Sequence, residues 1–131
     1  MKKLTKIGNY RKAIEDIAFA KEEIGKVETQ LDEIGTITIT DSLTIGKRSS
    51  ESQYLFALGV CNSRIECTVE LGLDPAVYID QKEKIKLVFE LSKELNFWKR
   101  FLNELLNYKE DMYDLLDNDE KASLLEYPRR G

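Results

Sequence analysis

Histidine is absent from this 131-residue sequence, and cysteine and proline each occur only twice. Without histidine, Ser-His-Asp and Cys-His catalysis are excluded, as are metal sites with an imidazole ligand. The seven glycines are scattered singly, so the chain has no glycine-rich loop that would cradle a phosphate. We therefore expect a protein that is not an enzyme and that uses no metal or other cofactor.

The two cysteines, Cys61 and Cys67, lie six residues apart in a segment whose pattern predicts a helix. That spacing separates them by about 9 Å along a helix axis, which is beyond the reach of a disulfide. We expect two free thiols, buried as small hydrophobic residues, in a reducing compartment. No apolar run approaches the roughly 18 residues of a membrane span, and polar residues interrupt the basic N-terminus. The sequence thus predicts a cytoplasmic protein without a membrane segment or a signal peptide.

Long helices are favoured by the composition, in which 42% of residues are hydrophobic and 34% are charged, with few helix breakers. The length suits one domain over residues 1–131. Asn9 is a candidate N-cap, Ser50 with Gln53 matches a capping box, and Asp74 precedes a proline as at a helix start. The expected helices span residues 9–34, 50–71, 74–116 and 118–126.

The hydrophobic period changes between the first two helices. Residues 36–40 alternate threonine and isoleucine, and after a possible turn at residues 41–42 a second short apolar run ends before Gly46. β-branched alternation is typical of strands. We expect a small β-hairpin or an extended connector at about residues 36–45, within a hairpin and linker region over residues 35–49.

The helix expected at residues 74–116 has the widest apolar stripe of the chain. Its heptad-like core positions are Val88, Leu91, Leu95, Trp98, Leu102 and Leu105, and Leu87, Phe97, Phe101, Leu106 and Tyr108 widen them to about half the circumference. A helix that packs against only one other helix needs a narrower apolar stripe. We therefore expect this helix to contact two neighbours, or one neighbour and a second molecule. The predicted fold is mainly α, an elongated, coiled-coil-like three-helix arrangement.

Two surfaces are candidates for binding. Aromatic residues on the long helix are either core or an interface with a partner or a second copy, and the interface candidates are Phe97, Trp98, Phe101 and Tyr108. The second candidate surface is basic, and its side chains either form solvated faces or contact an anionic partner. These cations are Lys2, Lys3, Lys6, Arg11, Lys12, Lys47 and Arg48. The net charge of -4 argues against a generic polyanion binder.

The order of elements resembles the helical region of phage late-transcription regulators of the ArpU/RinA type. The segments that carry the resemblance are residues 10–16, the serine-rich residues 49–52 and the Leu-Leu-Glu-Tyr segment at residues 124–127. The resemblance implies a phage or mobile-element origin. The family's helix-turn-helix would follow Tyr127, near the end of this sequence, so no DNA-binding residues are carried over.

The sequence thus predicts a non-enzymatic protein-protein interaction module, of phage or mobile-element origin, that binds and modulates or inhibits a host macromolecule. Its partner would be another protein, and a homo-oligomer is expected, with a dimer favoured. The alternative is a nucleic-acid-associated transcription regulator that uses the basic N-terminal arm. An all-α enzyme that uses carboxylates and a metal remains a minor third reading, without the paired carboxylate motif that it needs.

Overall fold

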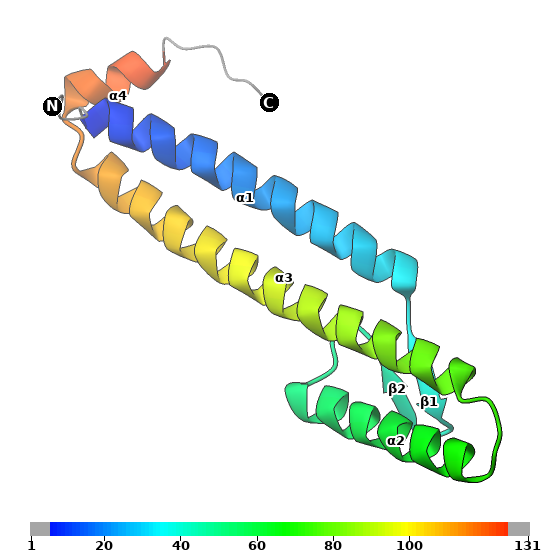
Figure 1. Ribbon diagram of the computed structural model, residues 1–131. Coiled ribbons are helices and arrows are strands. Elements are labelled where there is room, and N and C mark those ends of the chain that lie inside the picture. Colours follow the sequence, from blue (N-terminus) through cyan, green and yellow to red (C-terminus); the bar gives the residue numbers. More distant parts are fainter. Residues whose placement is uncertain (1–5, 126–131) are drawn as a thin grey trace, which may run out of the picture. The chain divides into compact units, whose positions relative to one another are not determined.

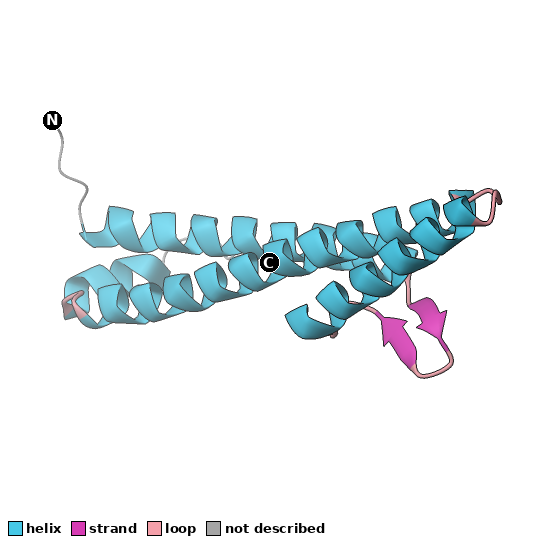
Figure 2. Cartoon of the chain, turned by 60° about the horizontal axis from the view of Figure 1, so that its bottom comes forward, coloured by secondary structure: helices cyan, strands magenta, loops and turns pink. Residues whose placement is uncertain are grey.

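The computed structural model describes residues 6–125 of the chain (Figure 1). Its elements are α1 (Lys6–Ile34), β1 (Ile37–Thr40), β2 (Leu43–Ile45), α2 (Glu51–Glu70), α3 (Ala76–Asp114) and α4 (Asn118–Leu125). Helices dominate, and the two strands form one antiparallel hairpin, which confirms the predicted mainly α fold class (Figure 2). Within the described range, no helix has an apolar stretch long enough to cross a membrane.

The helix ends follow the capping chemistry of the sequence. At the start of α2, the Ser50 hydroxyl accepts from the Gln53 amide at 3.2 Å while the Gln53 side chain accepts from the Ser50 amide at 2.7 Å. The same reciprocal pair joins Asp117 and Glu120 before α4, with distances of 2.7 and 3.1 Å. Asp74 accepts from the Ala76 amide at 3.0 Å at the start of α3. The restart signals read from the sequence therefore act as caps.

The predicted N-cap at Asn9 is wrong, because α1 already begins at Lys6. Ile7 is half-buried in the preceding turn, and this packing extends the helix past the local capping signal. At the other end, the helix stops where expected: Gly35 adopts a φ of +70°, and its amide donates to the Leu31 carbonyl at 3.0 Å. This left-handed conformation favours glycine after a helix.

The hairpin turns its isoleucines inward and its threonines outward. Ile37, Ile39 and Ile45 are buried, and Ile37 pairs with Ile45 across the ladder. Two side chains fix β1 to the helices: Arg64 of α2 donates to the Ile39 carbonyl at 2.8 Å, and Gln81 of α3 donates to the Thr38 carbonyl at 2.9 Å. These bonds and the buried isoleucines stabilise a hairpin that would be marginal alone.

The described chain forms two compact units, which we describe separately. The terminal unit comprises residues 6–24 and 98–125, and the central unit comprises residues 25–97. Helices α1 and α3 each contribute residues to both units. The expectation of a single domain over the whole chain stays a prediction.

The central unit has the larger buried core. Its most deeply buried large side chains are Tyr54, Ile45, Ile85, Val88 and Cys61. Tyr54 stacks on Phe89 of α3 with ring centroids 5.0 Å apart, and its hydroxyl bonds to the Gly46 carbonyl and, at 2.9 Å, to the Ser92 hydroxyl. One side chain thus joins α2, the linker after β2 and α3.

In the terminal unit, the core is aliphatic and contains both small and large side chains. The buried residues are Ala13, Ile17, Ala20, Met112 and Leu116. Around them, Tyr10 of α1 contacts Tyr113 of α3 with ring centroids 5.8 Å apart, and Lys121 of α4 lies 4.8 Å over the Tyr113 ring. Helix α3 therefore contacts α1 and α4 in this unit, and it contacts α2 and β1 in the central unit. The helix thus has more than one neighbour in each unit.

Candidate functional site

A row of aromatic rings lies at the surface of the terminal unit. Phe19 of α1 meets Trp98 of α3 edge-on, with centroids 5.8 Å apart and an interplanar angle of 74°. Trp98 meets Phe101 in the same manner, at 5.8 Å and 80°. Tyr108 follows Phe101 after two helical turns, on the same side of α3. We call these four residues the aromatic surface.

The rings of the aromatic surface are held in place but are not enclosed. The Phe19 side chain is 54% exposed and Tyr108 is 46% exposed, while Trp98 and Phe101 are half-buried. The interior of the unit is already filled by aliphatic side chains, among them Ala13, Ala20 and Ile17. The large rings therefore pack at its margin.

Three of the four aromatic candidates from the sequence therefore fall in one unit. Trp98 and Phe101 are in direct ring contact, and Tyr108 lies on the same helix side. The fourth candidate, Phe97, belongs to the central unit, where it is 59% exposed. Phe19 was missed because it lies off the apolar stripe of the first helix. A large aromatic residue on an otherwise polar helix face is the signal that would have identified it.

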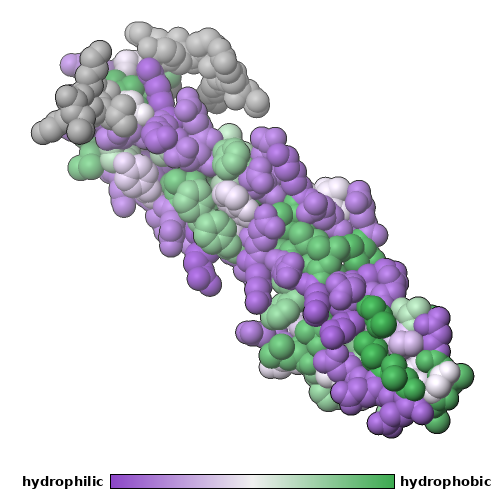
Figure 3. Space-filling model, in the orientation of Figure 1, coloured by the Kyte–Doolittle hydropathy of each residue, from purple (hydrophilic) through white to green (hydrophobic). Residues whose placement is uncertain are grey.

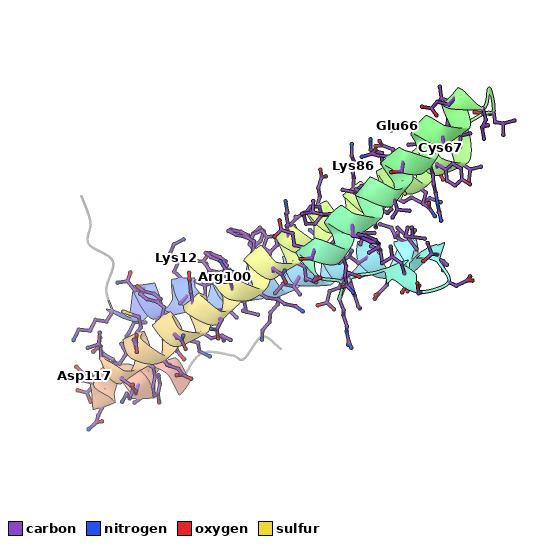
Figure 4. All side chains as sticks on the ribbon, turned by 90° about the horizontal axis from the view of Figure 1, so that it is seen from below. Lys12, Glu66, Cys67, Lys86, Arg100 and Asp117 are labelled. Carbon is purple, nitrogen blue, oxygen red and sulfur yellow. The ribbon has the colours of Figure 1, made fainter. Side chains whose placement is uncertain are left out.

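The basic candidates are divided between the units. Lys2 and Lys3 lie outside the described residues. In the terminal unit, Lys6 donates to the Leu115 carbonyl at 3.5 Å, Lys12 lies 4.0 Å from Asp16 (Figure 4), and Arg11 is half-buried.

The remaining basic candidates, Lys47 and Arg48, belong to the central unit. Lys47 forms an ion pair with Asp32 at 2.8 Å, and both cations line a polar hollow of about 420 Å³ beside the hairpin. Asp32 neutralises part of the positive charge there. Local acids and carbonyls thus engage Lys6, Lys12 and Lys47.

A second apolar surface belongs to α2 in the central unit. Leu55, Phe56, Gly59, Val60, Ser63 and Arg64 line a shallow hollow of about 550 Å³. Phe56 is 64% exposed and Leu55 is 54% exposed. We call this side of the helix the outer face of α2; the exposed residues Glu66 and Cys67, labelled in Figure 4, continue it toward the C-terminal end. Apolar patches also interrupt the hydrophilic surface on the side seen in Figure 3.

The cysteines differ in their surroundings. Both are free, Cys61 is buried and Cys67 is exposed, so the expectation that both are buried is wrong for Cys67. The reason is helical geometry: six residues turn the side chain by about 600°, which places Cys67 well away from the packed side of α2. Burial raises the pKa of the Cys61 thiol, and Arg64 and Lys82 oppose this rise only in part. Its neutral thiol, 3.4 Å from the Gln81 side-chain oxygen, is a poor nucleophile.

Among the described residues, no group of three or more cysteine, aspartate or glutamate side chains is placed to hold a metal ion. No protein-family model matches the sequence, and no curated protein or solved structure is significantly similar to it. The resemblance to ArpU/RinA-type regulators therefore stays a prediction. The arguments for a function come from the aromatic surface and the outer face of α2.

Proposed function

We propose that this protein is a non-enzymatic protein-interaction module that binds a partner protein through the aromatic surface of the terminal unit. The observation that carries the proposal is the Phe19–Trp98 pair, in which a ring that is 54% exposed stays in ordered edge contact with the tryptophan. The phage resemblance extends the proposal: a module of this kind would modulate or inhibit a host protein by occupying one of its surfaces.

The physical basis is the energy that aromatic side chains contribute to interfaces. Aromatic residues dominate binding hot spots, since they bury a large area and have few rotatable bonds. Here Trp98 is also held between Phe19 and Phe101, so its orientation is largely fixed before a partner arrives. Less rotational freedom is then lost on binding, which favours affinity.

The nucleic-acid alternative has less support. Lys6, Lys12 and Lys47 already contact a carbonyl or a carboxylate of the same chain. Exposed pairs of this kind are weak, so they would compete only modestly with phosphates. The basic candidates are also divided between the two units, and for this reason we favour a protein partner.

Photo-crosslinking tests the proposal with a matched pair of positions. A photoreactive phenylalanine analogue replaces Phe19 in one variant and Ile14 in the other; both side chains are exposed, at 54% and 42%. Five residues of helix separate them by about 140°, so they lie on different sides of α1. We expect a specific, saturable adduct with one protein from Phe19 only. The same adduct from both positions, or none from either, would contradict the proposal.

The captured partner then allows a quantitative measurement. Trp98 is the only tryptophan, so its fluorescence reports directly on binding to the purified partner. We expect Phe19→Ser to raise the dissociation constant by about 30-fold, as for a hot-spot residue, and Ile14→Ser to change it less than about threefold. Equal effects of the two substitutions would place the partner elsewhere.

A further inference from the structure

Helix α2 is apolar on two opposite sides, and only one of them is covered within the central unit. Tyr54, Ala57 and Cys61 point into the core and are almost completely buried. Leu55 and Phe56 project from the outer face and are mostly exposed. A helix with apolar residues around its circumference is normally buried on all sides. The outer face of α2 therefore has the composition of a second packing interface.

Gly59 lies in the middle of this outer face and has no function inside the central unit. Its backbone is ordinary helix, since the positive φ angles in the described chain belong to Gly35 and Gly72. A Cβ atom added at Gly59 would meet nothing within 4 Å. Glycine is unfavourable inside a helix unless a close approach requires it. Because nothing in this unit approaches Gly59, a close approach there can only come from outside the unit.

The charges along α2 are distributed unequally between its two ends. Lys47 and Arg48 lie just before the helix, whose N-terminus also carries a partial positive charge. Asp32, paired with Lys47, and Glu51 in the first turn offset part of this charge, and Arg48 remains as the cation beside the helix start. Glu66 and Glu70 lie at the other end and are exposed. A parallel second α2 would bring the glutamates of both copies together. An antiparallel one would bring the glutamates of each copy to the basic end of the other.

We propose that a second copy of this chain covers the outer face, with the two α2 helices antiparallel and crossing at Gly59. In this register Leu55 of each copy lies opposite Ser63 of the other, and Arg48 lies opposite Glu70. The large residues Leu55 and Phe56 of one copy enter the hollow over Gly59 and Ser63 of the other. The contact is isologous and closed, so it forms a dimer and stops there. It uses a surface separate from the aromatic surface and does not rest on the proposed function.

The first test substitutes Gly59 and a matched glycine. In Gly59→Leu, a good helix former with a large side chain fills the crossing point; in Gly25→Leu, the same change is made at another exposed helical glycine with open space around it. Sedimentation equilibrium of the full chain measures the dimer dissociation constant. We expect Gly59→Leu to raise it by about 30-fold or more and Gly25→Leu to change it less than about threefold.

Thermal unfolding of dilute protein shows whether the variants fold. Both leucine variants should have a Tm at least as high as that of the parent chain, because leucine favours the helix over glycine. A Gly59→Leu chain that is more stable as a monomer and impaired as a dimer is a combination that simple misfolding does not produce.

The second test reverses charges to establish the antiparallel register. Arg48→Glu and Glu70→Arg should each raise the dissociation constant about threefold to tenfold at low salt, and the doubly substituted chain should dimerise nearly as well as the parent. High salt should reduce all of these differences. Additive losses in the double variant would exclude the Arg48–Glu70 contact.

Other outcomes overturn the inference. A chain that stays monomeric at high concentration, or a dimer equally affected by both leucine substitutions, would show that a second copy does not cover the outer face. A monomer that loses a different bound protein on Gly59→Leu would assign this face to that protein. The proposed function stands or fails apart from these results, because Phe19→Ser should leave the dimer dissociation constant unchanged.

Discussion

The central and terminal units use the same two long helices but bury very different residues. In the central unit, α2 and the hairpin add to the segments of α1 and α3, and Tyr54, Ile45 and Ile85 are almost completely buried. In the terminal unit, the buried residues are aliphatic and include Ala13 and Ala20, and the rings of Phe19 and Tyr108 remain about half exposed. More neighbours allow large side chains to be enclosed, whereas fewer neighbours leave them at the surface. The comparison separates a core of enclosed large side chains from a surface of exposed aromatic rings.

The largest expected difference concerns truncation of one buried isoleucine in each unit. Ile85→Ala should lower the free energy of unfolding by about 4 kcal/mol, because Ile85 is fully buried among large neighbours and leaves a cavity. Ile17→Ala should cost about 2 kcal/mol, because the small residues around it can close the gap more easily. Urea denaturation measures both values, and hydrogen exchange assigns each loss to a unit. Equal losses would mean that the two cores are packed alike.

The next effect concerns a single hydroxyl group in the central unit. Tyr54→Phe removes the bonds to the Gly46 carbonyl and the Ser92 hydroxyl and should cost about 1–2 kcal/mol, since a buried polar group loses its partner. Adding Ser92→Ala should recover part of that loss. Tyr108→Phe is the control in the terminal unit, where the side chain is exposed, and it should change the stability by less than about 0.5 kcal/mol. If Tyr108→Phe lowered the stability as much as Tyr54→Phe, the proposed difference between the two units would be contradicted.

The smallest effect is a pH dependence of the terminal unit. Burial, and to a lesser degree the neighbouring Tyr113, raises the pKa of Tyr10 above its ordinary value. The folded unit therefore holds the Tyr10 proton more tightly than the unfolded chain does. Its stabilising contribution is complete below the ordinary tyrosine pKa near 10 and is lost as the pH rises through the raised value. Tyrosinate absorbance should show a late-titrating component that is lost in Tyr10→Phe; unchanged titration in that variant would disprove the assignment.

Much of the secondary structure could be predicted because its signals are local. The capping box of Ser50 with Gln53, the Asp74 cap and Gly35 each specify an end through contacts a few residues apart. The alternation of threonine and isoleucine predicts the hairpin in the same way, because inward and outward residues differ in type. The start of α1 was wrong for the complementary reason: the half-buried Ile7 packs in a turn that the local Asn9 signal does not include.

The candidate surfaces were only partly predictable, because they depend on which residues meet across the chain. Periodicity identified Trp98 and Phe101 as one stripe but could not tell that Phe19, 79 residues earlier, would lie against Trp98. Periodicity also placed Phe56 on α2 without revealing that its side would stay uncovered. Whether a glycine lies close to another helix depends on tertiary structure alone, so the sequence by itself did not distinguish Gly59 from Gly25.

The long separation between contacting residues in the terminal unit determines the order in which the chain can fold. Lys6 bonds to the carbonyl of Leu115, 109 residues later, whereas the bond between Gln81 and Thr38 in the central unit spans 43 residues. Closing a longer loop costs more entropy unless the intervening chain is already ordered. During synthesis, Phe19 emerges long before Trp98 exists to meet it. The aromatic surface is therefore assembled late, and a polypeptide interrupted before Trp98 would keep only Phe19 of its four residues.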